Sequence, residues 1–175
     1  MSAIQFIEDA AVDAALDRQL RELLSLCFTG PVNEVFRDRR YFKEPPRWRW
    51  FVPGNPLIAH IAVHDKIIGT TAGDVRIAGI AEVCVHPDHR GHGWVRQLLA
   101  AAHPWLAAQG IPFAMLFGLA KHYSSSGYRN VNNPLRHFDA DKKIWKTESF
   151  DNVMVRSFGA QEWPAGLVDL RGPTF

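Results

Sequence analysis

The residues best suited to chemistry lie in one segment, which runs from Val83 to Arg96 and reads Val-Cys-Val-His-Pro-Asp-His-Arg-Gly-His-Gly-Trp-Val-Arg. A predicted strand ends at Pro87, and a short loop with two glycines opens directly into a predicted amphipathic helix. The first turn of a helix has amide hydrogens without intrahelical acceptors and carries the positive end of the helix dipole. Gly91 and Gly93 lack Cβ atoms, so their backbone can lie close to phosphate oxygens. The segment therefore predicts an anion site, with an ordinary tight turn as the alternative.

The spacing within this segment narrows the kind of anion. A P-loop needs Gly-Lys-Ser/Thr and a dinucleotide fingerprint needs Gly-x-Gly-x-x-Gly, and neither pattern is present. The segment resembles the coenzyme-A motif of the GNAT acetyltransferase superfamily, which runs Arg/Gln-x-x-Gly-x-Gly/Ala after a strand that ends in Val-x-Pro. The matching residues are Val85-His86-Pro87 and then Arg90-Gly91-His92-Gly93-Trp94-Val95. The sequence departs from the motif at Val95, where Gly or Ala is usual, and this β-branched residue leaves less room beside a diphosphate.

Two further stretches support the resemblance. Tyr123-Ser124-Ser125-Ser126-Gly127-Tyr128 looks like the family's Tyr-x-x-x-Gly-aromatic segment, and it follows the apolar run Pro112–Leu119 in the family's order. The tail, from Trp163 to Gly166 and from Asp169 to Pro173, is similar to the C-termini of rhizobial nodulation acyltransferases and aminoglycoside 2′-N-acetyltransferases. The resemblance is best over residues 57–128 and moderate in the tail, whereas the first fifty residues match only in being helical.

The resemblance implies a fold and a reaction. The fold is an α/β mixed sheet, mostly antiparallel with a central parallel pair, flanked by helices. The reaction is acyl transfer from acetyl-CoA, or another acyl-CoA, to a primary amine, with no metal. The pantetheine arm would pair with the backbone of Val83, Cys84 and Val85 as an added strand. The residues expected around the diphosphate are Arg90, Gly91, His92, Gly93, Trp94, Val95 and Arg96.

Two proton transfers accompany this reaction. An oxyanion forms when the amine attacks the thioester, and a strand amide near Val83–Val85 is expected to stabilise it. Tyr123 is expected to protonate the leaving thiolate, because a phenol with a pKa of about 10 can be tuned to donate to a thiol of about 8.5. An alkylammonium has a pKa near 10.4, so a base must remove its proton, and Glu82 is the nearest carboxylate. Glu82 alternates with Val83 and Val85 and faces away from them unless a bulge intervenes, so a water relay is an equal alternative.

Two other clusters have competing interpretations. His86, His89 and His92 recur at intervals of three and could bind Zn²⁺, but ordinary loop histidines beside a phosphate site fit better. Arg47-Trp48-Arg49-Trp50 could stack on a sugar or an aromatic acceptor, but a strand with one buried and one solvated face is the simpler interpretation.

The periodicities predict the elements that position the motif. Helices are expected at 13–27, 32–42, 94–106 and 120–126, with a kink or early end caused by Pro104. Strands are expected at 48–52, 57–63, 67–71, 75–85, 112–119, 135–138, 144–147 and 153–158. A turn is expected at 64–66, and a bend at Gly73-Asp74 or Ala78-Gly79.

Composition limits the class of protein. The chain has 175 residues, 47% of them hydrophobic, and a single domain over residues 1–175 is expected. A net charge of +2 argues against nucleic-acid binding, and no apolar run approaches the ~20 residues that span a membrane. No secretion signal is recognisable, and two distant cysteines, Cys27 and Cys84, fit a reducing, cytoplasmic compartment. The sequence leaves a homodimer open.

A second class of function competes with the enzyme. Val95 and the lack of an obvious base are also expected of an acyl-CoA sensor or interaction module that has lost turnover. The acceptor is left open among small-molecule and peptide amines, which include aminoglycosides, polyamines, amino acids, protein N-termini and amino sugars.

Overall fold

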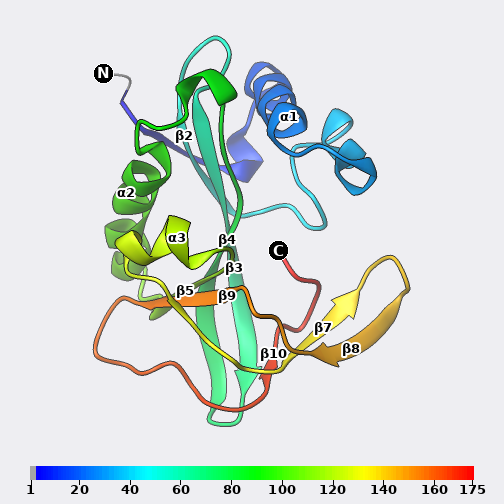
Figure 1. Ribbon diagram of the computed structural model, residues 1–175, viewed down its shortest axis with the longest axis vertical. Coiled ribbons are helices and arrows are strands. Elements are labelled where there is room, and N and C mark those ends of the chain that lie inside the picture. The colour runs from blue at the N-terminus through cyan, green and yellow to red at the C-terminus, as the bar shows by residue number, and fades with distance from the viewer. Residues whose placement is uncertain (1–2) are drawn as a thin grey trace. The chain divides into compact units, whose positions relative to one another are not determined.

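The computed structural model describes residues 3–175, which divide into two compact units (Figure 1). The first contains the residues up to Val63 together with Ala81–Ala102, and the second contains His64–Ile80 together with His103–Phe175. Two long strands, β3 (Ala59–Thr70) and β4 (Gly73–Val85), and the helix α2 (Trp94–Ala108) contribute residues to both units. The expectation of one domain stays a prediction.

The first unit begins with a strand and a capped helix. Its elements are β1 (Gln5–Glu8), the 3-10 helix η1 (Asp9–Ala11), α1 (Ala14–Cys27), the 3-10 helix η2 (Pro31–Arg37), β2 (Trp48–Val52) and the 3-10 turn η3 (Pro87–His89). Asp13 caps α1 by accepting a 2.8 Å hydrogen bond from the amide of Leu16. The predicted leucine face packs in a core with Phe36 and Phe51. The helix prediction for residues 13–27 is confirmed.

The helix predicted at 32–42 is shorter than expected. Only Pro31–Arg37 is helical, as a 3-10 helix. The chain after it is held by side chains instead: the guanidinium of Arg40 bonds Asp9 and Asp17, each at 2.9 Å. Ion pairs with distant carboxylates thus replace the backbone ladder that a longer helix would have had.

The sheet of the first unit is antiparallel. β1 pairs with β2, and β2 pairs with β3, with Trp50 opposite both Phe6 and Ile61. All five residues of β2 are buried, and Arg49 has no exposed surface. The expectation of a solvated face is therefore wrong, and so is a stacking surface that includes Arg49, because this guanidinium turns inward to carboxylates.

β3 and β4 form a long hairpin. The turn predicted at 64–66 is wrong, since β3 continues through it, and β4 runs through Ala78-Gly79 without a bend. The chain reverses at Thr71-Ala72, where the hydroxyl of Thr70 donates to the carbonyl of Gly73 at 2.8 Å. Pairing along the whole ladder outweighs the local preference of a few polar residues for a turn.

The second unit contains a mixed sheet with strand order β6-β9-β5-β4-β3-β10-β7-β8. Its further elements are β5 (Phe113–Phe117), α3 (Ala120–Tyr123), η4 (Ser124–Ser126), β6 (Arg129–Asn130), β7 (Leu135–Asp139), β8 (Ile144–Glu148), β9 (Val153–Ser157) and β10 (Val168–Asp169). β5 runs parallel to β4, and their register extends from Ile77↔Phe113 to Ile80↔Leu116. The predicted parallel pair within a mostly antiparallel sheet is confirmed.

α2 follows the glycine loop and matches its predicted apolar face. Leu98, Leu99, Ala102 and Leu106 are fully buried. Pro104 does not end the helix, which continues to Ala108 and is followed by Gly110 in the left-handed conformation, with φ +74°. Of the two outcomes expected from Pro104, a kink or an early end, the early end is therefore wrong, and the kink stays a prediction. None of the helices in residues 3–175 has the length and apolar character needed to cross a membrane.

Candidate functional site

The loop between β4 and α2 has the backbone geometry that the sequence predicted. Gly91 and Gly93 have φ angles of +82° and +71°, a region that side chains with a Cβ rarely occupy. A Cβ added at Gly91 would meet nothing within 4 Å, so the space above this residue is open. The two glycines thus fold a tight loop and keep its outer surface clear. Figure 1 shows the loop leading from β4 into α2.

The amides at the start of α2 are directed out of the helix. Within the described chain, the first of them to bond along the helix axis is that of Gln97, which donates to the carbonyl of Gly93 at 3.1 Å. The amides of residues 91–96 precede it, at the positive end of the helix dipole. The side-chain amide of Gln97 donates to the carbonyl of His92 at 3.1 Å and so links the loop to the first turn of α2. This is the geometry of an anion site.

The histidines of the loop bond to the loop itself. The Nδ1 atom of His92 lies 2.9 Å from the carbonyl of Arg90, and the ring of His86 accepts a hydrogen bond from the amide of Asp88 at 3.3 Å. The rings of His86 and His89 are 5.7 Å apart, edge to face. Across residues 3–175, no group of three or more histidine, cysteine, aspartate or glutamate side chains could hold a metal ion. The rings of His86 and His92 thus bond within the loop, and the ring of His89 packs against that of His86.

Strand β4 is interrupted just before this loop. Glu82 has a φ of +51°, a left-handed conformation that costs a residue with a Cβ about 1–2 kcal/mol. Such a residue inside a strand is typical of a β-bulge. After it, the side chain of Cys84 is buried whereas Val83 and Val85 are half-buried. The positive φ of Glu82 indicates the bulge that the sequence left open, so the regular alternation of side chains between Glu82 and the two valines no longer follows.

Three hydrogen bonds hold Glu82 in this conformation. The amide of Phe42 donates to Oε1 at 2.8 Å, and Nη1 of Arg49 donates to Oε2 at 3.4 Å. Nδ1 of His60 lies 3.1 Å from the backbone carbonyl of Glu82, and Nε2 lies 3.0 Å from Nη1 of Arg49. Because Arg49 can only donate, His60 is protonated on Nδ1 and donates to the carbonyl. The neutral ring thereby links the bulge to the buried guanidinium.

The surroundings of Glu82 raise the pKa of its carboxyl toward neutral pH. Its side chain is only 5% exposed, and burial raises its pKa from 4.5 to about 7, against the opposing charge of Arg49 and the amide of Phe42. For His60, burial and the nearby Arg49 charge lower the pKa well below its ordinary value, which agrees with the neutral ring. A carboxylate that titrates near neutral pH can accept a proton under ordinary conditions.

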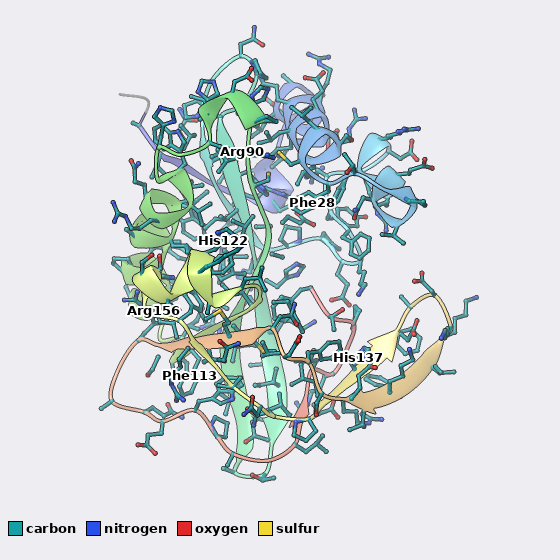
Figure 2. The ribbon with its side chains drawn as sticks, in the orientation of Figure 1. Phe28, Arg90, Phe113, His122, His137 and Arg156 are labelled. Atoms are coloured by element: carbon teal, nitrogen blue, oxygen red, sulfur yellow. The ribbon has the colours of Figure 1, made fainter. Side chains whose placement is uncertain are left out.

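The coenzyme residues expected on β4 have additional contacts. The carbonyl of Val85 lies 3.3 Å from Sγ of Cys27 and 3.4 Å from Nε of Arg90. Arg90 is exposed in the loop and is labelled in Figure 2. Val95 and Trp94 are half-buried in the first turn of α2, and Arg96 is exposed. Glu82, Val83–Val85 and residues 90–96 therefore all lie in the first unit, along the end of β4, the loop and the start of α2.

Tyr123 belongs to the second unit, where it ends α3. Its half-buried ring packs over Gly118, where an added Cβ would overlap the ring, and its centroid lies 6.1 Å from that of Tyr128. Tyr128 is buried, and its hydroxyl bonds Nε2 of His103 at 2.9 Å. Of the two tyrosines in the motif, Tyr128 is thus a core residue, whereas the role expected of Tyr123 stays a prediction.

Sequence reasoning missed the residues that support Glu82. Asp9, Arg49 and His60 are scattered over three elements, and only the fold brings them together. The sequence pattern around Arg49 predicts a stacking surface or a strand with one solvated face, and neither buries this guanidinium. The one available signal was an arginine in the middle of an apolar strand, Trp48–Val52.

Replacing Glu82 with Gln is expected to change how stability depends on pH. Folding raises the pKa of the Glu82 carboxyl from 4.5 to about 7. The protonated carboxyl therefore stabilises the folded wild type below pH 4.5, and this stabilisation is lost as the pH rises through about 7. Glutamine does not titrate. The free energy of unfolding of Glu82→Gln, measured with urea, should therefore rise relative to wild type between about pH 5 and pH 8. A difference that stays constant over this range would contradict the buried, proton-binding carboxyl.

Comparisons with known proteins agree with this geometry. The model of the acetyltransferase (GNAT) domain family matches residues 11–131. Among solved structures, the chain is similar to the GNAT N-acetyltransferase YhbS from Escherichia coli in complex with CoA, with a TM-score of 0.67 and 17% identity over 97% of this chain and 91% of that one. It is also similar to a GNAT acetyltransferase from Brucella melitensis in complex with acetyl-CoA, with a TM-score of 0.64 and 15% identity over 96% of each chain.

Some similar structures are much longer. The chain covers 33% of a probable N-acyltransferase from Enterococcus faecalis, with a TM-score of 0.58 and 15% identity over 74% of this chain. No curated protein matches the sequence. At these identities the structures show a shared fold, a mixed sheet flanked by helices. The family model covers more than half of the sequence, and the chain therefore belongs to the GNAT acetyltransferase family.

Proposed function

We propose that this protein transfers an acetyl or other acyl group from acyl-CoA to a primary amine of a small molecule or peptide. The observation that carries the proposal is the Gly91–Gly93 turn, which leads directly into α2, where the amide of Gln97 is the first to bond back along the helix, to the carbonyl of Gly93. A diphosphate is the group that such a turn suits best. Two similar structures hold CoA or acetyl-CoA, which supports the coenzyme in this role.

The pantetheine arm is assigned to β4 beyond the bulge. Val83 and Val85 are half-buried and lie directly before the loop, so an extended chain along them would lead into the diphosphate site. The carbonyl of Val85 accepts from a thiol, which is a weak donor, at 3.3 Å and from Nε of Arg90 at 3.4 Å, which is long for nitrogen, so a pantetheine amide can replace these contacts at low cost. An amide of this strand segment would then donate to the oxyanion.

The proton that leaves the amine goes to Glu82, directly or through a water relay. Burial gives this carboxyl a pKa of about 7, which suits a base at neutral pH. Its oxygens already bond Phe42 and Arg49, so the relay through water fits the geometry better. Tyr123 is assigned to protonate the departing thiolate of CoA.

Gly93→Asp should weaken acetyl-CoA binding by about tenfold or more, because it places a carboxylate where phosphate oxygens bind and adds strain at φ +71°. Isothermal titration measures the effect. Gly110→Asp is the matched control, since Gly110 has φ +74° and an added Cβ there would meet nothing within 4 Å, but it lies after the end of α2. Equal acetyl-CoA affinities of the two variants would contradict the placement of the diphosphate at this loop.

Release of free CoA distinguishes an enzyme from a sensor of the same fold. Incubation of the protein with acetyl-CoA and a panel of polyamines, amino sugars, amino acids and peptides should release thiol, which a thiol reagent detects, in step with acetylated amine found by mass spectrometry. Binding of acetyl-CoA without release for every amine would favour the sensor, for which Val95 in the motif is the supporting observation. Absence of binding would contradict both.

Tyr123→Phe is expected to lower turnover by about tenfold to a hundredfold while acetyl-CoA affinity changes little, because phenylalanine keeps the ring packing over Gly118 and removes only the donor. Tyr128→Phe is the control: it deprives His103 of its partner and should lower stability more than turnover. Steady-state kinetics and thermal unfolding separate the two effects. Unchanged turnover of Tyr123→Phe would exclude the acid role.

A further inference from the structure

The first unit contains a pair of cysteines in direct contact. Cys27 is the last residue of α1, and Cys84 lies in β4, two residues after the bulge. Cys84 belongs to the buried cluster against which Cys27 packs, and the thiol of Cys27 donates to the carbonyl of Val85, the residue after Cys84, at 3.3 Å. Both cysteines are reduced. Cys84 is 5% exposed, whereas Cys27 is only half-buried, so Cys27 is the more exposed residue of the pair.

The two thiols differ in acidity. The hydrogen bond from Cys84 and the nearby guanidinium of Arg90 lower the pKa of Cys27 to about 7, against the effect of burial. The pKa of Cys84 is raised well above its ordinary value, by the hydrogen bond to Cys27, by burial, and by the charges of Cys27 and Glu82. A thiolate is the reactive form of cysteine, so Cys27 is the nucleophile of the pair. Arg90 and Phe28, the residue after Cys27, are labelled in Figure 2.

We infer that Cys27 and Cys84 form a modification site at which a hydroperoxide converts two thiols into a disulfide. The Cys27 thiolate attacks the outer peroxide oxygen, the O–O bond breaks, and Cys27 becomes a sulfenic acid while the remaining oxygen leaves as an alcohol or water. The sulfur of Cys84 then attacks the sulfur of Cys27, the S–O bond breaks, and its hydroxide leaves as water with the proton from Cys84. In sum, two thiols and one hydroperoxide give one disulfide, one alcohol or water, and one water.

The contact geometry favours each of these steps. A hydroperoxide is small and uncharged, so it can reach a half-buried thiolate that a bulky disulfide such as glutathione disulfide would contact poorly. Conversion to sulfenic acid removes the negative charge on Cys27, and with it two of the causes that raise the pKa of Cys84. The first step thus prepares the second, which is what a resolving cysteine requires.

The disulfide would act on the strand assigned to the coenzyme. A covalent S–S bond is shorter than a hydrogen-bonded sulfur contact, so the end of α1 and β4 must shift toward each other and the Cys27–Val85 contact must change. Weaker coenzyme binding after oxidation is the expected consequence. This consequence rests on the proposed function, whereas formation of the disulfide does not.

The test is oxidation of the reduced full chain with one equivalent of hydrogen peroxide near pH 7. Free thiols counted in denaturant should fall from two to none, the intact mass should drop by two hydrogen atoms, and dithiothreitol should reverse both changes. Cys84→Ser should stop at a sulfenic acid that dimedone traps, and Cys27→Ser should keep its remaining thiol. Oxidation should be about tenfold faster in the folded chain than in denaturant. Retention of both thiols in the wild type, or no dimedone adduct on Cys84→Ser, would overturn the inference.

A second measurement separates this inference from the proposed function. Acetyl-CoA titrated into the oxidised and reduced wild type should show affinity about tenfold weaker after oxidation, with Cys27→Ser unaffected by peroxide. If the thiols pair and affinity is unchanged, the link to the coenzyme is wrong and the modification site stands. If the reduced protein does not bind acetyl-CoA, the proposed function is wrong, and the thiol counts still decide the modification site.

Discussion

The buried guanidinium of Arg49 is the interaction on which the first unit depends. It has no exposed surface, and it bonds Asp9 at 2.6 Å, Glu82 at 3.4 Å and the carbonyl of Arg40 at 2.8 Å. Taking a charge out of water costs several kcal/mol, and removing one partner of such a pair typically costs about 3–5 kcal/mol. A chain that places Arg49 in the middle of β2 must therefore assemble these partners whenever this unit folds.

That constraint reaches β4 through His60. Arg49 donates to Nε2 of His60, which fixes the proton on Nδ1 and directs it to the carbonyl of Glu82. The left-handed residue is therefore held from both its side chain and its backbone, and the strain of the bulge is offset by bonds that no straight strand would make. The segment Val83–Val85 and the loop after it continue from this fixed point. Buried ionic contacts thus position the strand segment whose backbone groups are proposed to bind the coenzyme.

The sequence predicted the local features and missed those that depend on distant residues. The leucine period and the Asp13 cap located α1, and the paired glycines located the turn before α2, because these signals lie within a few residues. The turn expected at 64–66 was wrong because the β3–β4 ladder, not three polar residues, sets the conformation. The burial of Arg49 depends on Asp9, 40 positions away, and on Glu82, 33 positions away, and no local pattern encodes either partner.

The two carboxyls that contact Arg49 have opposite protonation behaviour, and the geometry explains why. For Asp9, burial raises the pKa, but a hydrogen bond from Arg40 and the charges of both guanidinium groups outweigh it, so the net pKa is lowered. For Glu82, burial dominates because Arg49 is farther away, at 3.4 rather than 2.6 Å. Asp9 therefore stays ionised between Arg40 and Arg49. Glu82 is left as the buried group that exchanges a proton near pH 7, next to the strand that the coenzyme is proposed to occupy.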